Sequence, residues 1–232
     1  MINTIVAQIR TILKNNNSVL VTAPTGAAAH NVGGQTIHRE IKISVKKKKG
    51  SSLANSAKEH LIQKLSQTVE LIFNKQSMIS QRVLRSAEIN VRTTAHGGEH
   101  SNEDWGGIPI VVILGDNYQL TPPCEEGAID SFHNQGNSEE SKNGAYHFIN
   151  LGQCSNELST IMRQDESQME LRDILKNTRI GEPSENNIKS LLSLHLNSGN
   201  LSVKQIQEIE DHALYIFSNK KLMKELFVNN IQ

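Results

Sequence analysis

The chain has 232 residues, of which 24 are lysine or arginine and 24 are aspartate or glutamate, so its formal net charge is zero. This length suffices for one domain of ordinary size and part of a second. A neutral chain excludes a basic coat over the whole surface, so any nucleic-acid binding requires a local groove.

Membrane-spanning and secreted classes are excluded on similar grounds. No apolar run approaches the roughly 20 residues that cross a bilayer, and Gln8 and Arg10 interrupt the apolar N-terminus, unlike a secretory signal. Cys124 and Cys154 alone cannot staple a fold of this length, and we expect both to be reduced. We therefore predict an intracellular protein that is not associated with a membrane.

Short apolar runs predict the strands of an α/β fold. Residues 1–14 carry apolar side chains at spacings of three and four, which predicts an amphipathic helix. A first strand is predicted at 18–22, with a turn at 23–26 and a helix at 27–31. Further strands are predicted at 69–73 and 108–114. The last run is continuously apolar, which is typical of a parallel strand covered on both faces. The fold class is therefore α/β with a parallel sheet.

The segments that follow these strands are the candidate functional region. In open parallel sheets, ligands bind beyond the carboxyl ends of the strands. We therefore expect residues 24–26, 74–76 and 116–119 to converge at one edge of the sheet.

Polar segments separate the predicted elements, and we expect 46–52, 93–104 and 134–144 to be surface insertions. The lysines at 46–49 are either solvated, or they line a groove or serve nuclear import. His96 and His100 have a metal-like spacing, but the glycines between them argue against a helix that presents both, so we predict no metal site there.

In the C-terminal third of the chain, helices are predicted at 165–177 and 220–228, and a strand at 213–217.

Four strings in chain order, between about residues 9 and 230, resemble motifs of the Pif-type (petite integration frequency) DNA helicases, RecD-like members of superfamily 1. Residues 23–29 read APTGAAA and 34–38 read GQTIH, similar to the motif that contacts single-stranded DNA. Residues 115–123 read GDNYQLTPP and resemble the third motif. Residues 77–80 resemble the end of the second motif, and 162–164 with 175–181 resemble the fourth.

The resemblance implies a RecA-like motor domain of the phosphate-loop NTPase class at 1–155 and the start of a second, incomplete one at 156–232. It also implies an ATP-dependent DNA helicase that moves 5′ to 3′ along single-stranded DNA, using ATP and Mg²⁺. The resemblance further suggests a role in DNA repair, recombination and telomere maintenance. The compartments it suggests are the nucleus and the mitochondrion.

Roles for individual residues come from the same resemblance. The implied contacts with single-stranded DNA are Pro24, Thr25, Gly26, Thr36 and His38. The implied nucleotide-side residues are Asp116, Gln119, which senses the γ-phosphate, and Arg163, which reaches the transferring phosphate. From the residues alone, simpler structural roles remain open for several of them. Thr25 could be a helix cap, His38 a structural histidine, Asp116 and Gln119 turn residues, and Arg163 a solvated side chain.

Two departures from the family pattern argue against ATP hydrolysis. The sequence contains no G-x-x-x-x-G-K-[ST] phosphate loop, so we expect Met1 to lie downstream of the family's loop. Asn74 and Lys75 stand where the family has Asp-Glu, the residues that order Mg²⁺ and activate the attacking water. Losing the base alone costs about 10²- to 10⁴-fold in rate. The alternative function is therefore a catalytically inactive pseudo-helicase, or a transposon-derived remnant, that at most binds single-stranded DNA.

Overall fold

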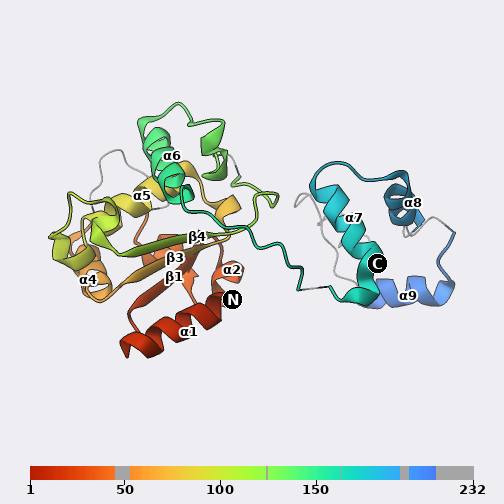
Figure 1. Cartoon of the computed structure of the whole chain (residues 1–232), viewed down its shortest axis with the longest axis horizontal. Coiled ribbons are helices and arrows are strands. Elements are labelled where there is room, and N and C mark those ends of the chain that lie inside the picture. The colour runs from red at the N-terminus through yellow and green to blue at the C-terminus, as the bar shows by residue number, and fades with distance from the viewer. Residues whose placement is uncertain (45–52, 124, 163, 194–198, 213–232) are drawn as a thin grey trace, which may run out of the picture. The chain divides into compact units, whose positions relative to one another are not determined.

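The computed structural model describes residues 1–44, 53–123, 125–162, 164–193 and 199–212, and the chain divides into two units, Met1–Ser159 and Thr160–Gln232 (Figure 1). None of the described helices is long and apolar enough to span a bilayer.

Unit 1 is built on a four-stranded parallel sheet with strand order β2-β1-β3-β4. The strands are β1 (Val19–Ala23), β2 (Gln35–Thr36), β3 (Glu70–Asn74) and β4 (Ile110–Leu114). The three predicted strands are thereby confirmed. The two-residue β2 was not predicted, because it is too short to carry a hydropathy pattern.

The prediction that residues 108–114 are covered on both faces is confirmed only in part: Val111 and Ile113 pack against the core on one face and Leu114 against the core on the other, but the cover is incomplete. Within the part of the chain that the structure describes, β4 is an outer strand of the sheet. Its side chains are partly exposed along the whole strand, and Ile110 is 42% exposed, whereas β1 is buried throughout. An apolar run therefore identified the strand, but it could not identify the neighbours that would bury it.

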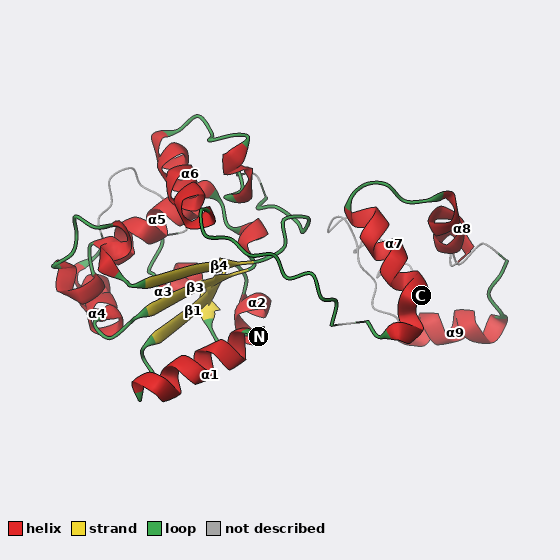
Figure 2. Cartoon of the chain, in the orientation of Figure 1, coloured by secondary structure: helices red, strands yellow, loops and turns green. Residues whose placement is uncertain are grey.

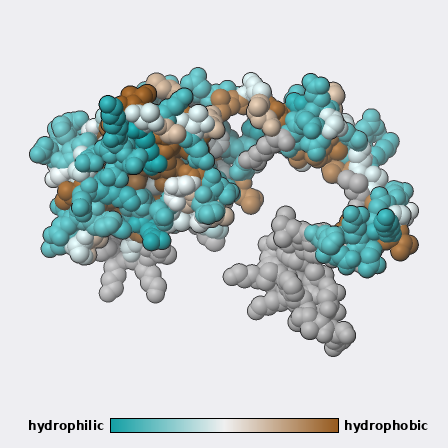
Figure 3. Space-filling model, turned by 90° about the horizontal axis from the view of Figure 1, so that it is seen from below, coloured by the Kyte–Doolittle hydropathy of each residue, from teal (hydrophilic) through white to brown (hydrophobic). Residues whose placement is uncertain are grey.

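Helices cover the two faces of the sheet unequally (Figure 2). On one face, α1 (Ile2–Leu13) places Val6 against Val19, Val21 and Ile72. The opposite face carries the larger core, formed with α3 (Ile37–Glu40), α4 (Asn55–Leu65), α5 (Gln81–Arg92) and α6 (Glu139–Gly152). Helix α2 (Gly26–Asn31) follows β1 directly. Seen from the side shown in Figure 3, the described surface is mostly hydrophilic, with separate hydrophobic patches.

Two of the predicted surface insertions are in fact partly buried. Within 93–104, Thr94 and Ala95 have no exposed surface, and a 3-10 helix runs over Ala95–Gly98. Within 134–144, α6 begins at Glu139, and Gly144 lies so close to α5 that a Cβ there would be 1.8 Å from the carbonyl oxygen of Gln81. Small and polar side chains help to pack α6 onto α5. The low hydropathy of 134–144 therefore led to the wrong prediction of a loop. The lysines at 46–49 lie outside the described residues.

Unit 2 contains the helices α7 (Met169–Arg179), α8 (Glu185–Ser193) and α9 (Val203–His212). The helix predicted at 165–177 is confirmed by α7, although α7 begins and ends a few residues later in the chain. The predicted strand at 213–217 and helix at 220–228 lie outside the described residues. That this unit begins a second RecA-like domain, with a boundary at 155/156, stays a prediction.

Candidate functional site

The strand register brings the predicted functional segments to one edge of the sheet. Thr22 pairs with Phe73 and Phe73 with Ile113, so the chain leaves β1, β3 and β4 at the same level. Ala23 also pairs with Thr36, which adds the end of β2 to the same edge. We call this edge the rim, comprising residues 24–26, 36–38, 74–76 and 115–119. The predicted convergence of the strand ends is confirmed (Figure 2).

The ends of β3 and β4 are in direct contact at the rim. The side-chain amide of Gln76 donates to the side-chain oxygen of Asn117. A Cβ on Gly115 would be 2.6 Å from the backbone nitrogen of Gln76, so only glycine fits where the two segments touch. The sequence gives no signal for this contact, because Gln76 and Asn117 are ordinary turn residues far apart in the chain.

Lys75 occupies a backbone conformation that is unusual for its type. Its φ of 62° lies in the left-handed region, which costs a non-glycine residue roughly 1–2 kcal/mol. The 3-10 helix η1 (Gln76–Met78) follows at once. The chain therefore turns sharply at the end of β3, at the residue whose charge departs most from the family pattern.

The segment after β4 forms a tight turn around Asp116. A side-chain oxygen of Asp116 accepts from the backbone N–H of Tyr118 at 3.0 Å, and its carbonyl accepts from the N–H of Gln119 at 3.2 Å. Asp116 is half-buried and Gln119 is exposed. These bonds account for Asp116 as a turn residue, and they leave the Gln119 side chain in an exposed position on the loop. Their nucleotide-side roles stay predictions.

The segment after β1 has the geometry of a capped helix start. Thr25 is the N-cap of α2, and its side-chain oxygen accepts from the N–H of Ala28 at 3.3 Å. A Cβ on the exposed Gly26 would meet no atom within 4 Å, so packing does not require glycine there. By contrast, a Cβ on Gly34 would be 2.4 Å from the carbonyl oxygen of Val21, so Gly34 is needed for the fold.

The remaining predicted contacts of this group are half-buried. Pro24, Thr36 and His38 are each partly exposed at the rim, and the carbonyl of His38 accepts from the N–H of Ile43 at 3.0 Å. Their contact with DNA stays a prediction. Arg163, the predicted phosphate-contacting arginine, lies outside the described residues.

The rim is a poor fit for Mg²⁺ bound to ATP. Mg²⁺ prefers carboxylate, phosphate and water oxygens, whereas the end of β3 offers the amide of Asn74 and the ammonium group of Lys75, both half-buried. Asp116 is the carboxylate that the described rim contributes. The end of β3 therefore lacks the pair of carboxylates that would hold Mg²⁺ and activate water.

Other potential ligand groups lie outside the rim. His96 and His100 meet edge to face with ring centroids 5.9 Å apart, and His100 pairs with Glu103 at 2.7 Å. Within the described segments, one cluster brings three ligand-type groups within 4.8 Å of one another, namely Glu88, Asp104 and His147. None of these belongs to the rim.

Comparison with known proteins identifies the family. Residues 1–188 match the family described as PIF1-like helicase. The chain belongs to this family. The resemblance predicted from the four strings is thereby confirmed.

Individual relatives agree with this assignment over shorter stretches. The chain is 32% identical over 127 residues to the ATP-dependent DNA helicase PIF1 of Candida albicans, covering 50% of this chain and 13% of that protein. It is 28% identical over 128 residues to the ATP-dependent DNA helicase RRM3 of Saccharomyces cerevisiae, covering 54% of this chain and 17% of that protein. The chain thus spans less than a fifth of these relatives.

A solved structure supports the fold assignment. A Pif1 helicase, from a study of two coordinating Pif1 helicases unwinding forked double-stranded DNA, superimposes with a TM-score of 0.59 at 26% identity. The match covers 83% of this chain and 44% of that one. The α/β fold of unit 1 is therefore that of a RecA-like motor domain, as the sequence predicted.

Proposed function

We propose that this chain is a motor lobe of a PIF1-like helicase that holds single-stranded DNA at the rim but does not hydrolyse ATP by itself. The observation that carries this proposal is Lys75, next to Asn74 at the end of β3, where the family has an Asp-Glu pair. The family match supports the DNA-binding half of the proposal.

The electrostatic argument concerns the metal that accompanies ATP. A cation replaces an anion at the end of β3, and this reversal of a unit charge about 4 Å from a bound cation costs several kcal/mol at the effective dielectric of a protein. The catalytic base is lost with the same substitution.

The DNA-binding argument concerns access to the backbone. Gly26 is exposed and has open space where a side chain would lie, so a phosphate of the DNA strand could approach the main chain there. Phosphate contacts position a strand without reading its sequence. Thr36 and His38 lie at the same edge, because Thr36 pairs with Ala23 at the end of β1.

The test is binding of a fluorescent oligothymidine to the full chain, followed by anisotropy. Gly26→Asp puts a negative charge at the open position and should weaken binding at least tenfold at low salt. The matched control is Asn16→Asp, the same charge change at an exposed turn at the amino end of β1. Equal binding by both variants would contradict the proposed DNA position.

A second candidate function is a working ATP-dependent DNA helicase that translocates 5′ to 3′ in repair, recombination or telomere maintenance. The family match over residues 1–188 favours it. Nuclear or mitochondrial residence is part of the same proposal. DNA-stimulated ATP hydrolysis by this chain separates the two candidates, because only the second predicts turnover.

A further inference from the structure

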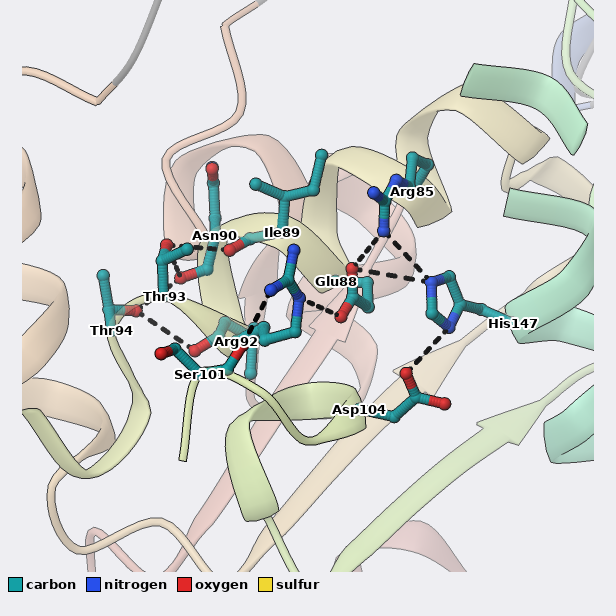
Figure 4. A network of polar contacts seen from close by, with 11 residues as sticks. Arg85, Glu88, Ile89, Asn90, Arg92, Thr93, Thr94, Ser101, Asp104 and His147 are labelled. Carbon is teal, nitrogen blue, oxygen red and sulfur yellow. Dashed lines mark hydrogen bonds and ion pairs between the residues drawn. The ribbon is translucent and has the colours of Figure 1, made fainter. Parts of the chain in front are cut away.

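A buried ionic cluster outside the rim joins α6 to α5. His147 on α6 is 5% exposed and packs against Glu88 on α5, which is fully buried (Figure 4). Arg85 contacts Glu88 at 2.6 Å, and Arg92 contacts its other carboxylate oxygen at 2.8 Å. Asp104, at the start of the 3-10 helix η3 (Asp104–Gly107), faces the imidazole from the other side at 3.9 Å.

The contact with Arg85 favours one tautomer of the neutral imidazole. Arg85 Nη1 lies 3.2 Å from His147 Nε2. A guanidinium can only donate, so Nε2 accepts and the single proton of the neutral ring sits on Nδ1. Nδ1 is buried and has no hydrogen-bond partner, because Asp104 at 3.9 Å is beyond hydrogen-bond range.

The charges of the cluster balance only while His147 is neutral. Two guanidinium groups, of Arg85 and Arg92, face two carboxylates, of Glu88 and Asp104. Arg85 Nη1 contacts both Glu88 and the imidazole, and a cationic group in this position argues against a metal ion there. Adding a proton to Nε2 would place a hydrogen against the guanidinium that now donates to this nitrogen, so Arg85 would have to move.

We propose that His147 is a proton-sensitive latch, which holds α6 on α5 while neutral and loosens α6 when it is protonated. The charged groups that face the ring are Arg85, Glu88 and Arg92 from α5 and Asp104 from η3, with Tyr146 beside it on α6. The latch is independent of the proposed DNA-binding function.

The direction of the effect follows from burial. Desolvation lowers the pKa of His147 below its ordinary value of 6.5, and Arg85 and Arg92 act in the same direction, while Glu88 and Asp104 oppose them. A base with a lowered pKa contributes its stability above the unfolded value of 6.5 and loses it as the pH falls toward the folded value. The latch therefore opens on acidification.

Trp105 provides a direct probe of the latch. It is the single tryptophan of the chain, and its ring centroid lies 6.1 Å from that of His147. A charged imidazole quenches indole fluorescence in contact with it. We expect the fluorescence of the folded chain to fall on acidification, with a midpoint below pH 6.5.

The decisive comparison uses His147→Gln, whose side-chain oxygen still accepts from Arg85 but does not titrate. This variant should lose the fluorescence transition and at least half of the drop in urea midpoint between pH 7.5 and 5.5. His60→Gln, at an exposed histidine on α4, should keep both. The proposal is overturned if His147→Gln keeps the fluorescence transition unchanged, or if the midpoint of this transition in the wild type lies at or above pH 6.5.

A second variant covers the case in which His147→Gln does not fold. Asp104 is 54% exposed, so Asp104→Asn is tolerated, and it removes a negative charge that favours protonation. The fluorescence midpoint should then shift further down. Amide hydrogen exchange should in parallel show α6 losing protection at pH 5.5, relative to β1 and β3. A midpoint that does not move, or equal losses in all three elements, contradicts the proposal.

Discussion

Replacing Gly144 by alanine tests the packing of α6 on α5. A Cβ at this position would be 1.8 Å from the carbonyl oxygen of Gln81 and 2.6 Å from its carbonyl carbon. Real Cβ atoms do not approach other heavy atoms closer than about 3.0 Å, so the helices must move apart by about 1.2 Å or α6 must shift along its axis. Backbone atoms on both sides leave no flexible side chain to absorb the change.

The expected magnitude combines two opposing effects. Alanine gains up to about 1 kcal/mol over glycine in a helix interior. Overpacking a well-filled contact costs typically 1–3 kcal/mol and sometimes more. Because this clash is with backbone and the helices hold Phe148 and Leu84 in the core, we expect a net loss of about 2 kcal/mol in the free energy of unfolding.

The assay is urea unfolding of the full chain followed by Trp105 fluorescence, which reports on unit 1 alone. The matched control is Gly26→Ala, the same substitution at a site where a Cβ meets no atom within 4 Å. It should leave stability unchanged or raise it by up to about 1 kcal/mol. If the Gly144→Ala variant had the same free energy of unfolding as the Gly26→Ala variant, the close approach of α5 and α6 would be refuted.

Two further predictions concern the approach of β2 to β1 and the rim. Gly34→Ala places a Cβ 2.4 Å from the Val21 carbonyl oxygen, and it should lower the free energy of unfolding by about 1–3 kcal/mol in the same assay; wild-type stability would mean that β2 lies farther from β1. In a chimera that carries a relative's phosphate-loop segment upstream, Asn74→Asp with Lys75→Glu should hydrolyse ATP about 10²- to 10⁴-fold faster than the unsubstituted chimera, measured as phosphate release with single-stranded DNA. Equal rates would show that these two residues do not occupy the metal and base positions.

The sequence predicted the sheet better than its covering helices. Short runs of β-branched and aliphatic residues mark β1, β3 and β4, and parallel strands necessarily deliver their carboxyl ends to one edge. From that rule alone, Lys75 and Asp116 were expected at the same edge of the sheet. The partial exposure of β4 was not predictable, because a run of apolar residues does not indicate which elements pack beside it.

The contact between α5 and α6 was not predicted, for a physical reason. Their contact is made by groups that normally indicate a surface, including the buried Glu88 and His147 and the small residues Ser141 and Gly144. Ion pairing and close backbone approach add there to the apolar burial of Leu84 and Phe148, and neither leaves a hydropathy pattern. The cluster around His147 was therefore invisible in the sequence, since its members come from three separate segments.

ATP hydrolysis by the full chain, measured together with oligothymidine anisotropy in the same sample, tests the central claim most directly. A rim with Lys75 at the end of β3 should bind the oligonucleotide while releasing no phosphate above the protein-free background. Turnover within the ordinary enzymatic range of about 1–10³ s⁻¹, stimulated by the oligonucleotide, would contradict it.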